Sequence, residues 1–181
     1  MSVLAIDPGP ERSAYAAWDG SRVTHSGMCA NGELREIVAR LEQRRPKQTP
    51  GDPTHLAVEH SKSYLVPRKS GAPFFPQQVL DTALEAGRFI EAWDGPHSLV
   101  DRRAVKLYLV GRASCGDAEI RAALLDQIGP RGTKANPGPL YGVTRDRLAA
   151  LAVAVTWWDT VRPELELGCG QNVASDERKG G

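Results

Sequence analysis

Cysteines, aromatic residues and long apolar runs are all scarce in this chain of 181 residues. Its three cysteines, Cys29, Cys115 and Cys169, are far apart and odd in number, which argues against a disulfide framework and against a CxxC zinc site. No stretch approaches the roughly 18 apolar residues that a bilayer-spanning helix needs, and the apolar run after Met1 is too short for a signal peptide. We therefore expect a cytoplasmic protein with reduced thiols and no membrane association.

An excess of charge of either sign is missing as well. Lys and Arg number 23 and Asp and Glu number 22, so the net charge of +1 gives no case for a nucleic-acid partner, and any such case must be local. A GxxxxGK[ST] loop is also absent, so we expect no nucleotide cofactor. The 41% share of hydrophobic residues is that of an ordinary globular domain. We expect one domain over residues 1–165 and a disordered, polar tail over residues 166–181.

The first thirty residues predict a three-stranded meander. Val3 to Ile6 form a continuous apolar run that closes in Asp7-Pro8-Gly9, which is typical of a strand buried on both faces and ending in a turn. Strands are predicted over 13–18 and 22–28, because the intervening Asp19-Gly20 is a strong hairpin signal.

The rest of the chain alternates strands and helices. Short apolar runs predict strands at His55–Glu59 and Ser98–Val100. Apolar residues at helical spacing predict helices from Asn31 to before Pro46, Pro76 to Trp93, Arg103 to Val110, Asp117 to Ile128 and Thr144 to about Thr160. Asn31 and Asp117 are the expected N-caps of their helices. The pattern predicts an α/β fold, a mixed five-stranded sheet with helices on both faces.

Three carboxylates stand where chemistry is plausible. Asp7 ends the first strand, Glu59 ends the fourth, and Asp146 lies in the first turn of the last helix. Parallel first and fourth strands would bring Asp7 and Glu59 to the same edge of the sheet. Converging carboxylates repel each other unless a cation neutralises them, and such hard oxygen ligands suit Mg²⁺ or Mn²⁺. A turn, a solvated strand edge and a favourable helix dipole are the simpler explanations for the three residues taken singly.

The connection from His60 to Pro76 is unusually long and follows Glu59 directly. Loops of this length tend to be functional or disordered. Bases in it could hold phosphates and rings could stack on an unpaired base, which makes the candidate nucleic-acid contacts Lys62, Tyr64, Arg68, Lys69 and Phe74.

Several short motifs in their order along the chain resemble those of one family. They are Ile6-Asp7-Pro8-Gly9 with Ala14-Tyr15-Ala16, Ala57-Val58-Glu59, Ala86-Gly87-Arg88, Val105-Lys106 through Val110-Gly111, Glu119-Ile120 through Leu125, and the run from Leu148 to Thr156. Together they resemble the RuvC-type Holliday junction resolvases, within the RNase H-like nucleases. The resemblance covers nearly all of residues 2 to 160.

This resemblance implies an RNase H-like fold and a metal-dependent endonuclease that cuts four-way or other branched DNA by two-metal phosphodiester hydrolysis. By position it assigns catalysis and the ligation of Mg²⁺ or Mn²⁺ to Asp7, Glu59 and Asp146. It also implies a homodimer. The helix predicted over 76–93, with Leu80, Leu84 and Ile90, is the expected shared surface.

The sequence departs from the family pattern at three positions. Ala149 stands where a second acidic residue of the last helix is usual, Ala14 where a glycine is usual, and Asp117 where a lysine is usual. The first departure leaves the number of bound metal ions open, and the third leaves the mode of DNA contact open. Two alternatives therefore stand beside the junction resolvase: a YqgF-like RNA-processing nuclease of the same fold, and a non-catalytic nucleic-acid-binding protein with a lapsed site.

Overall fold

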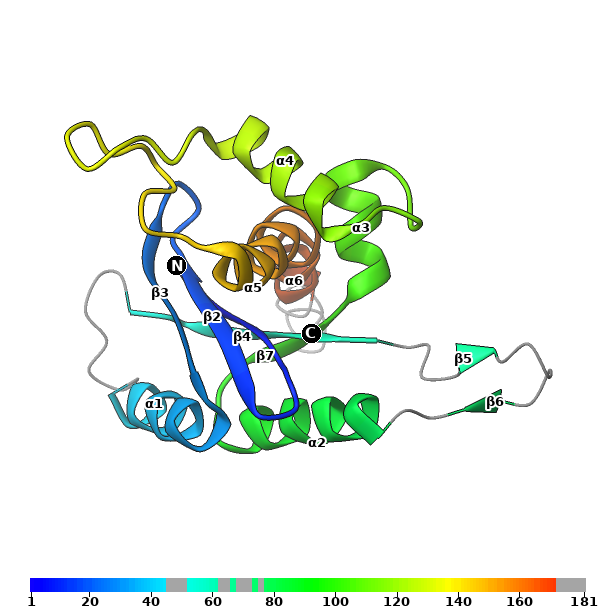
Figure 1. The fold of residues 1–181 in the computed structure, drawn as a ribbon. Helices are drawn as coiled ribbons and strands as arrows, with labels where there is room; N and C mark the ends of the chain where they lie inside the picture. The colour runs from blue at the N-terminus through cyan, green and yellow to red at the C-terminus, as the bar shows by residue number, and fades with distance from the viewer. Residues whose placement is uncertain (45–51, 62–65, 68–72, 75–76, 172–181) are drawn as a thin grey trace, which may run out of the picture.

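A five-stranded mixed sheet forms the centre of the molecule (Figure 1). The computed structural model describes residues 1–44, 52–61, 66–67, 73–74 and 77–171. In the order β3-β2-β1-β4-β7, the strands are β3 (Val23–Ala30), β2 (Arg12–Trp18), β1 (Val3–Asp7), β4 (His55–His60) and β7 (His97–Asp101). β1 is antiparallel to β2 and parallel to β4, which is parallel to β7. The predicted sheet is confirmed, and the first and fourth strands have the parallel pairing that brings Asp7 and Glu59 to one edge.

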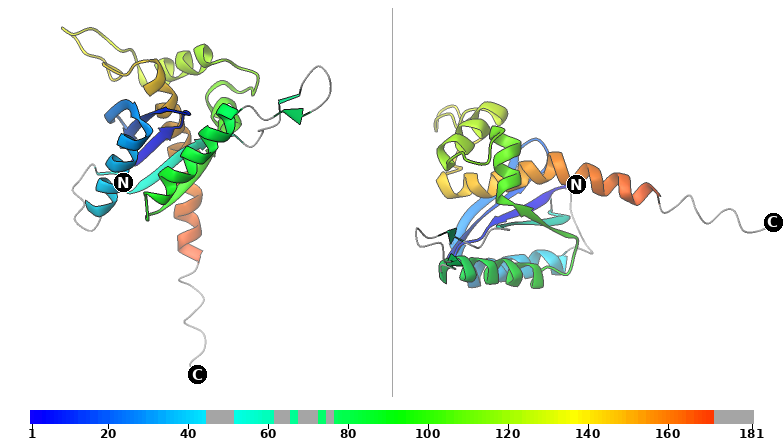
Figure 2. Two further views of the ribbon diagram at one scale, coloured as in Figure 1. Left: turned by 60° about the horizontal axis from the view of Figure 1, so that its bottom comes forward. Right: turned by 90° about the vertical axis from the view of Figure 1, so that its right-hand side faces the viewer.

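Helices cover both faces of this sheet, as predicted. α1 (Asn31–Arg44) and α2 (Gln77–Glu91) lie on one face, and α3 (Arg102–Val110), α4 (Asp117–Ile128) and α5 (Arg145–Thr156) lie on the other (Figures 1 and 2). A second, two-stranded sheet joins β5 (Val66–Pro67) and β6 (Pro73–Phe74). None of the helices in the described part of the chain has the length and apolar character needed to cross a membrane.

The alternation of side chains along β1 divides the core in two. Val3 and Ala5 belong to the cluster under α5, whereas Leu4 and Ile6 belong to the cluster under α1 and α2. All four are almost fully buried, which is why the run lacks polar residues. The strand is therefore held from both faces right up to Asp7.

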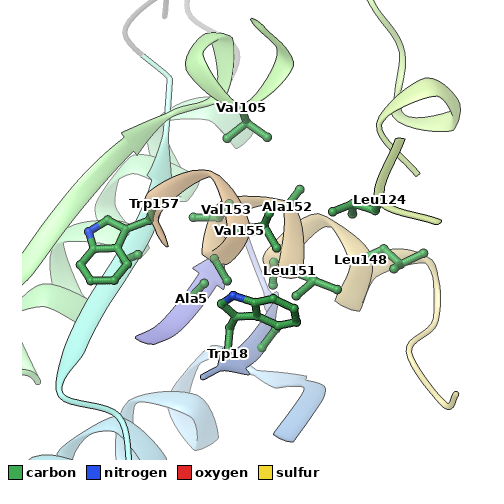
Figure 3. Close-up of a cluster of buried hydrophobic side chains, with 14 of the residues drawn as sticks. Ala5, Trp18, Val105, Leu124, Leu148, Leu151, Ala152, Val153, Val155 and Trp157 are labelled. Atoms are coloured by element: carbon green, nitrogen blue, oxygen red, sulfur yellow. The ribbon is translucent and has the colours of Figure 1, made fainter. Parts of the chain in front are cut away.

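α5 is the central helix of its layer. Leu148, Leu151 and Val155 pack with Trp18 of β2 and with the other side chains of the cluster in Figure 3. Trp157 at its end is fully buried, and its ring lies 4.3 Å from the ring of His55, centroid to centroid. The first turn of α5, which carries Asp146, is thereby fixed over the sheet.

Three local expectations were wrong. Helical backbone does not end near Thr160 but continues through a π-helical turn (Trp157–Val161) into α6 (Arg162–Gln171). Asn31 is the first residue of α1 and its amide bonds to other segments, and the N-cap of α4 is Gly116, not Asp117. The side chain of Asn31 has tertiary partners and so does not cap α1. At α4, Gly116 takes the N-cap position in place of Asp117.

Candidate active site

Two of the predicted carboxylates lie side by side because of strand pairing and side-chain parity. Ile6 pairs with Val58 in the parallel ladder, so the next residues, Asp7 and Glu59, reach the same edge of the sheet. Residues at odd positions of β1 and β4, such as Ala5 and Ala57, belong to the cluster under α5. Asp7 and Glu59 share that parity and point to the same layer.

A small polar network holds the turn that follows Asp7. The Ser13 hydroxyl donates to Asn31 Oδ1 over 2.7 Å and accepts from the Gly9 amide over 3.1 Å, while Asn31 Nδ2 donates to the Gly9 carbonyl over 3.0 Å. Gly9 is required there, because a Cβ atom would lie 2.3 Å from the Arg12 carbonyl oxygen. Asn31 therefore holds the turn that directly follows Asp7, a role that its expected place as an N-cap did not reveal.

Arg102 enters the site from the junction of β7 and α3, which has no intervening loop residue. The Asp101 carboxylate caps α3 by accepting from the Arg103 amide over 2.9 Å. Arg102 Nη1 lies 2.7 Å from Glu59 Oε1, and its Nη2 lies 2.8 Å from Asp117 Oδ1 at the start of α4. One guanidinium thus connects carboxylates from the sheet and from a helix.

All three predicted carboxylates line one cavity of about 160 Å³. Asp146 reaches it from the first turn of α5, where Ala149 and Ala152 leave room because their side chains are small. Four charged residues that the sequence analysis did not assign to the site also line it: Arg102, Asp117, Arg121 and Arg145. A second cavity of about 330 Å³ shares Asp7, Glu59 and Arg102 and continues past His60 toward α2.

The electrostatics of the site are dominated by buried negative charge. Burial, and then the neighbouring Glu59 carboxylate, raise the pKa of Asp7 from 3.8 to about 7, while Arg102 opposes the rise. Burial also raises the pKa of Glu59, again against the effect of Arg102. Arg102 does not return either pKa to its ordinary value, so a further positive charge beside Asp7 and Glu59 would be favourable.

The chemistry of these donors suits a divalent metal ion. Carboxylates from β1, β4, α4 and α5 line the same cavity, and oxygen ligands of this kind suit Mg²⁺ or Mn²⁺. Within residues 1–44, 52–61 and 77–166, however, no three His, Cys, Asp or Glu side chains stand close enough together to hold a metal ion. The guanidinium of Arg102 lies against one Glu59 oxygen instead.

The five predicted nucleic-acid contacts are not tested. Lys62, Tyr64, Arg68 and Lys69 lie outside the described residues, and only the backbone of Phe74 is described, in β6 opposite Val66. The signals for the unpredicted site residues were present but weak. Arg102 directly follows a strand, as a site residue often does, and Asp117 shares with Asp146 its place in the first turn of a helix.

Comparisons with known proteins give structural likenesses only. A scan against protein-family models and a search of curated proteins both find no match. Thermus thermophilus RuvC is 19% identical with a TM-score of 0.56, and the match covers 90% of this chain and 96% of that one. The same protein in complex with a Holliday junction substrate gives 19% identity and a TM-score of 0.59, over 91% and 96% of the two chains.

A third solved structure, the yeast mitochondrial Holliday junction resolvase Ydc2, is 11% identical with a TM-score of 0.52. That match covers 94% of this chain and 85% of the yeast protein. At such identities the likeness concerns the fold. The expected α/β fold of the RNase H-like type is thereby confirmed over nearly the whole chain.

Proposed function

We propose that this protein is a metal-dependent endonuclease that cuts branched DNA, with the four-way junction as its substrate. One observation carries the proposal: Asp7, Glu59 and Asp146, from three separate elements, line a single cavity at one edge of the sheet. The support from comparison is that this sheet and its helices share the fold of RuvC, a protein solved with a Holliday junction substrate.

The residues of the chain divide the work between ligation and phosphate binding. Asp7, Glu59 and Asp146 would hold Mg²⁺ or Mn²⁺, and Asp117 adds a fourth carboxylate to the same cavity. A divalent ion bound there supplies the positive charge that activates water and stabilises the leaving oxygen of a phosphodiester. Arg121 and Arg145 line the cavity too, and their guanidinium groups suit the phosphate next to the cleaved bond.

A cleavage assay on matched substrates tests the proposal. Labelled four-way junction, linear duplex, single strand and structured RNA are incubated with the protein in Mg²⁺ and in EDTA. We expect paired nicks in the junction, only with Mg²⁺. Cleavage of RNA alone would favour the RNA-processing alternative, and junction binding without cleavage would favour the non-catalytic one.

Paired incision of a two-fold symmetric junction requires two sites related by the same symmetry, so we propose a homodimer. α2 offers the shared surface, because Leu80 is 45% exposed and Leu84 is 54% exposed. Ile90, by contrast, packs partly against the core beneath α1 and α2. Sedimentation at micromolar concentration should give a dimer for the wild type and a monomer for Leu84→Arg; a monomeric wild type, with or without junction, contradicts this proposal.

The connection after Glu59 is proposed to contact the branch point, with Tyr64 and Phe74 stacking on unpaired bases and Lys62, Arg68 and Lys69 near phosphates. Base stacking on an aromatic ring is worth roughly 1–3 kcal/mol. Tyr64→Ala should therefore weaken junction affinity about 5-fold or more without changing the salt dependence of binding, which counts phosphate contacts. A loss of melting temperature alone would make Tyr64 structural.

A further inference from the structure

Arg102 is the best-connected cation of the site. Its Nη1 lies 2.7 Å from Glu59 Oε1 and its Nη2 lies 2.8 Å from Asp117 Oδ1. The two partners differ in environment, since the side chain of Glu59 is 10% exposed and that of Asp117 is 68% exposed. Arg102 itself is 37% exposed, so it stands between the buried and the open part of the cavity.

The contact with Glu59 satisfies a charge that burial would otherwise leave uncompensated. A buried carboxylate without a partner is strongly destabilising, and a guanidinium is a permanent cation whose fork fits carboxylate oxygens. A divalent cation held by Glu59 would bind the same carboxylate, whose Oε1 atom Arg102 already contacts. A metal ion bound by Glu59 would lie close to Arg102 and the two positive charges would repel each other, so the two cations compete for Glu59.

We propose that Arg102 is a tethered counter-cation, which holds Glu59 while no divalent ion is bound and releases it when one binds. The inference rests on the proposed function, because it concerns the metal that the nuclease would use. Arg102 is thus a positioning residue for Glu59, and it sets how tightly the site binds metal.

Asp117 gives the released guanidinium a second anchor. It is the more exposed partner, lies at the first residue of α4, and contacts the other nitrogen of the fork. Arginine has a long side chain with several rotatable bonds, so rotation about this contact can remove Nη1 from Glu59 while Nη2 remains with Asp117. Release therefore needs no movement of β7 or α3.

Removal of the guanidinium should tighten metal binding. Arg102→Met keeps most of the apolar stem but leaves Glu59 free, so a divalent ion no longer has to displace a charge-assisted hydrogen bond. We expect the dissociation constant for Mn²⁺ to fall roughly tenfold or more. In EDTA the same variant should melt at a lower temperature than the wild type, because Glu59 and Asp117 lose the guanidinium that contacts them both. Among the described residues, no other cation contacts both carboxylates.

The test is titration calorimetry with Mn²⁺ alone on the wild type, Arg102→Met, Arg103→Met and Glu59→Gln. Arg103 is the matched control, since it is the next residue, is exposed, and uses only its backbone amide in the cap of α3. Arg103→Met should bind Mn²⁺ as the wild type does, and Glu59→Gln should bind Mn²⁺ more weakly. A merely structural role for Arg102 would not make metal binding tighter.

Equal or weaker Mn²⁺ binding by Arg102→Met overturns the inference. If the wild type still binds Mn²⁺ and cleaves junctions, the proposed function stands without the inference about Arg102. If neither the wild type nor any variant binds Mn²⁺, the inference and the proposed function both fail. Should Arg102→Met not fold, Arg102→Lys replaces it, because lysine keeps the charge but cannot bridge two carboxylates with a fork. Its dissociation constant should lie below that of the wild type, and a value equal to or above it also overturns the inference.

Discussion

Replacing Asp7 with Asn should make the metal-free protein more stable at neutral and alkaline pH. The change removes a charge that is partly buried beside Glu59. A pKa that rises from 3.8 to about 7 corresponds to a destabilisation of at most about 4 kcal/mol once the group is ionised. Asp7 keeps some contact with solvent, and the removal of one charge also relaxes its neighbours, so we expect about 2 kcal/mol.

The pH window follows from the two pKa values. In the unfolded chain Asp7 ionises near 3.8, and in the folded protein near 7, so folding favours its protonated form. The stability that this group contributes is fully present below pH 3.8 and is lost as the pH rises to about 7. Asn does not titrate. The gain in stability of Asp7→Asn over the wild type should therefore grow from pH 3.8 to about 7 and stay constant at higher pH.

Thermal unfolding followed by circular dichroism in EDTA, from pH 4.5 to 8.5, measures the effect. At pH 8 the melting temperature of Asp7→Asn should exceed that of the wild type by about 4–8 °C, given that 1 kcal/mol moves a chain of this size by about 2–4 °C. Asp126→Asn, an exposed position on α4, is the matched control and should show no such gain. The reasoning is refuted if Asp7→Asn is no more stable at pH 8, or if its gain does not shrink toward pH 4.5.

Glu59→Gln and Asp146→Asn should each lower the rate of junction cleavage at least about 100-fold without loss of junction binding, because they remove charge that the transition state needs while phosphate contacts survive. Single-turnover cleavage and gel-shift assays measure this, and near-normal cleavage by Asp146→Asn would remove α5 from the site. Asn31→Ala should lower the free energy of unfolding by about 1–3 kcal/mol in urea denaturation, because the buried Ser13 hydroxyl loses its acceptor; unchanged stability would mean that the turn after β1 is held without this network. Burial lowers the pKa of His55 from 6.5 to about 4, so folding favours the neutral imidazole. The free energy of unfolding should therefore fall as the pH drops from 6.5 to about 4. His55→Gln should lack this fall, and identical pH profiles of the two proteins would contradict the assignment.

The fold could be predicted because its signals are local and repeated. The unbroken apolar run of β1 reflects burial on both faces, and the helical spacing in α1 reflects one apolar face packed on the sheet. α5 is apolar nearly all round because it packs between the sheet and the helices α3 and α4. The extension into α6 could not be predicted in the same way. Polar pairs support it instead, with Arg162 over the ring of Trp158 and near Glu166, and such pairs leave no apolar period in the sequence.

The site was predictable only in part for a related reason. Asp7 and Glu59 were found because a carboxylate directly after an apolar strand is visible in the sequence. Arg102 stands beside Arg103 in the sequence, and a basic pair of this kind is typical of a solvated face. The place of Arg102 in the cavity depends on the parallel pairing of β4 with β7 and on the direct junction of β7 with α3, which are properties of the tertiary structure.

The position of Ala149 in the structure bears on the number of carboxylates at the site. Ala149 lines it, so the helix position that could have carried a further acidic side chain does face the site. Asp117 lines the same cavity from α4, and its carboxylate is held by Arg102. The number of carboxylates around the cavity is therefore four although α5 contributes one, and the additional carboxylate comes paired with a cation. Asp117 contacts the guanidinium of Arg102, which under the inference above competes with a metal ion for Glu59. If that competition operates, the charge at Asp117 is part of the control of metal binding.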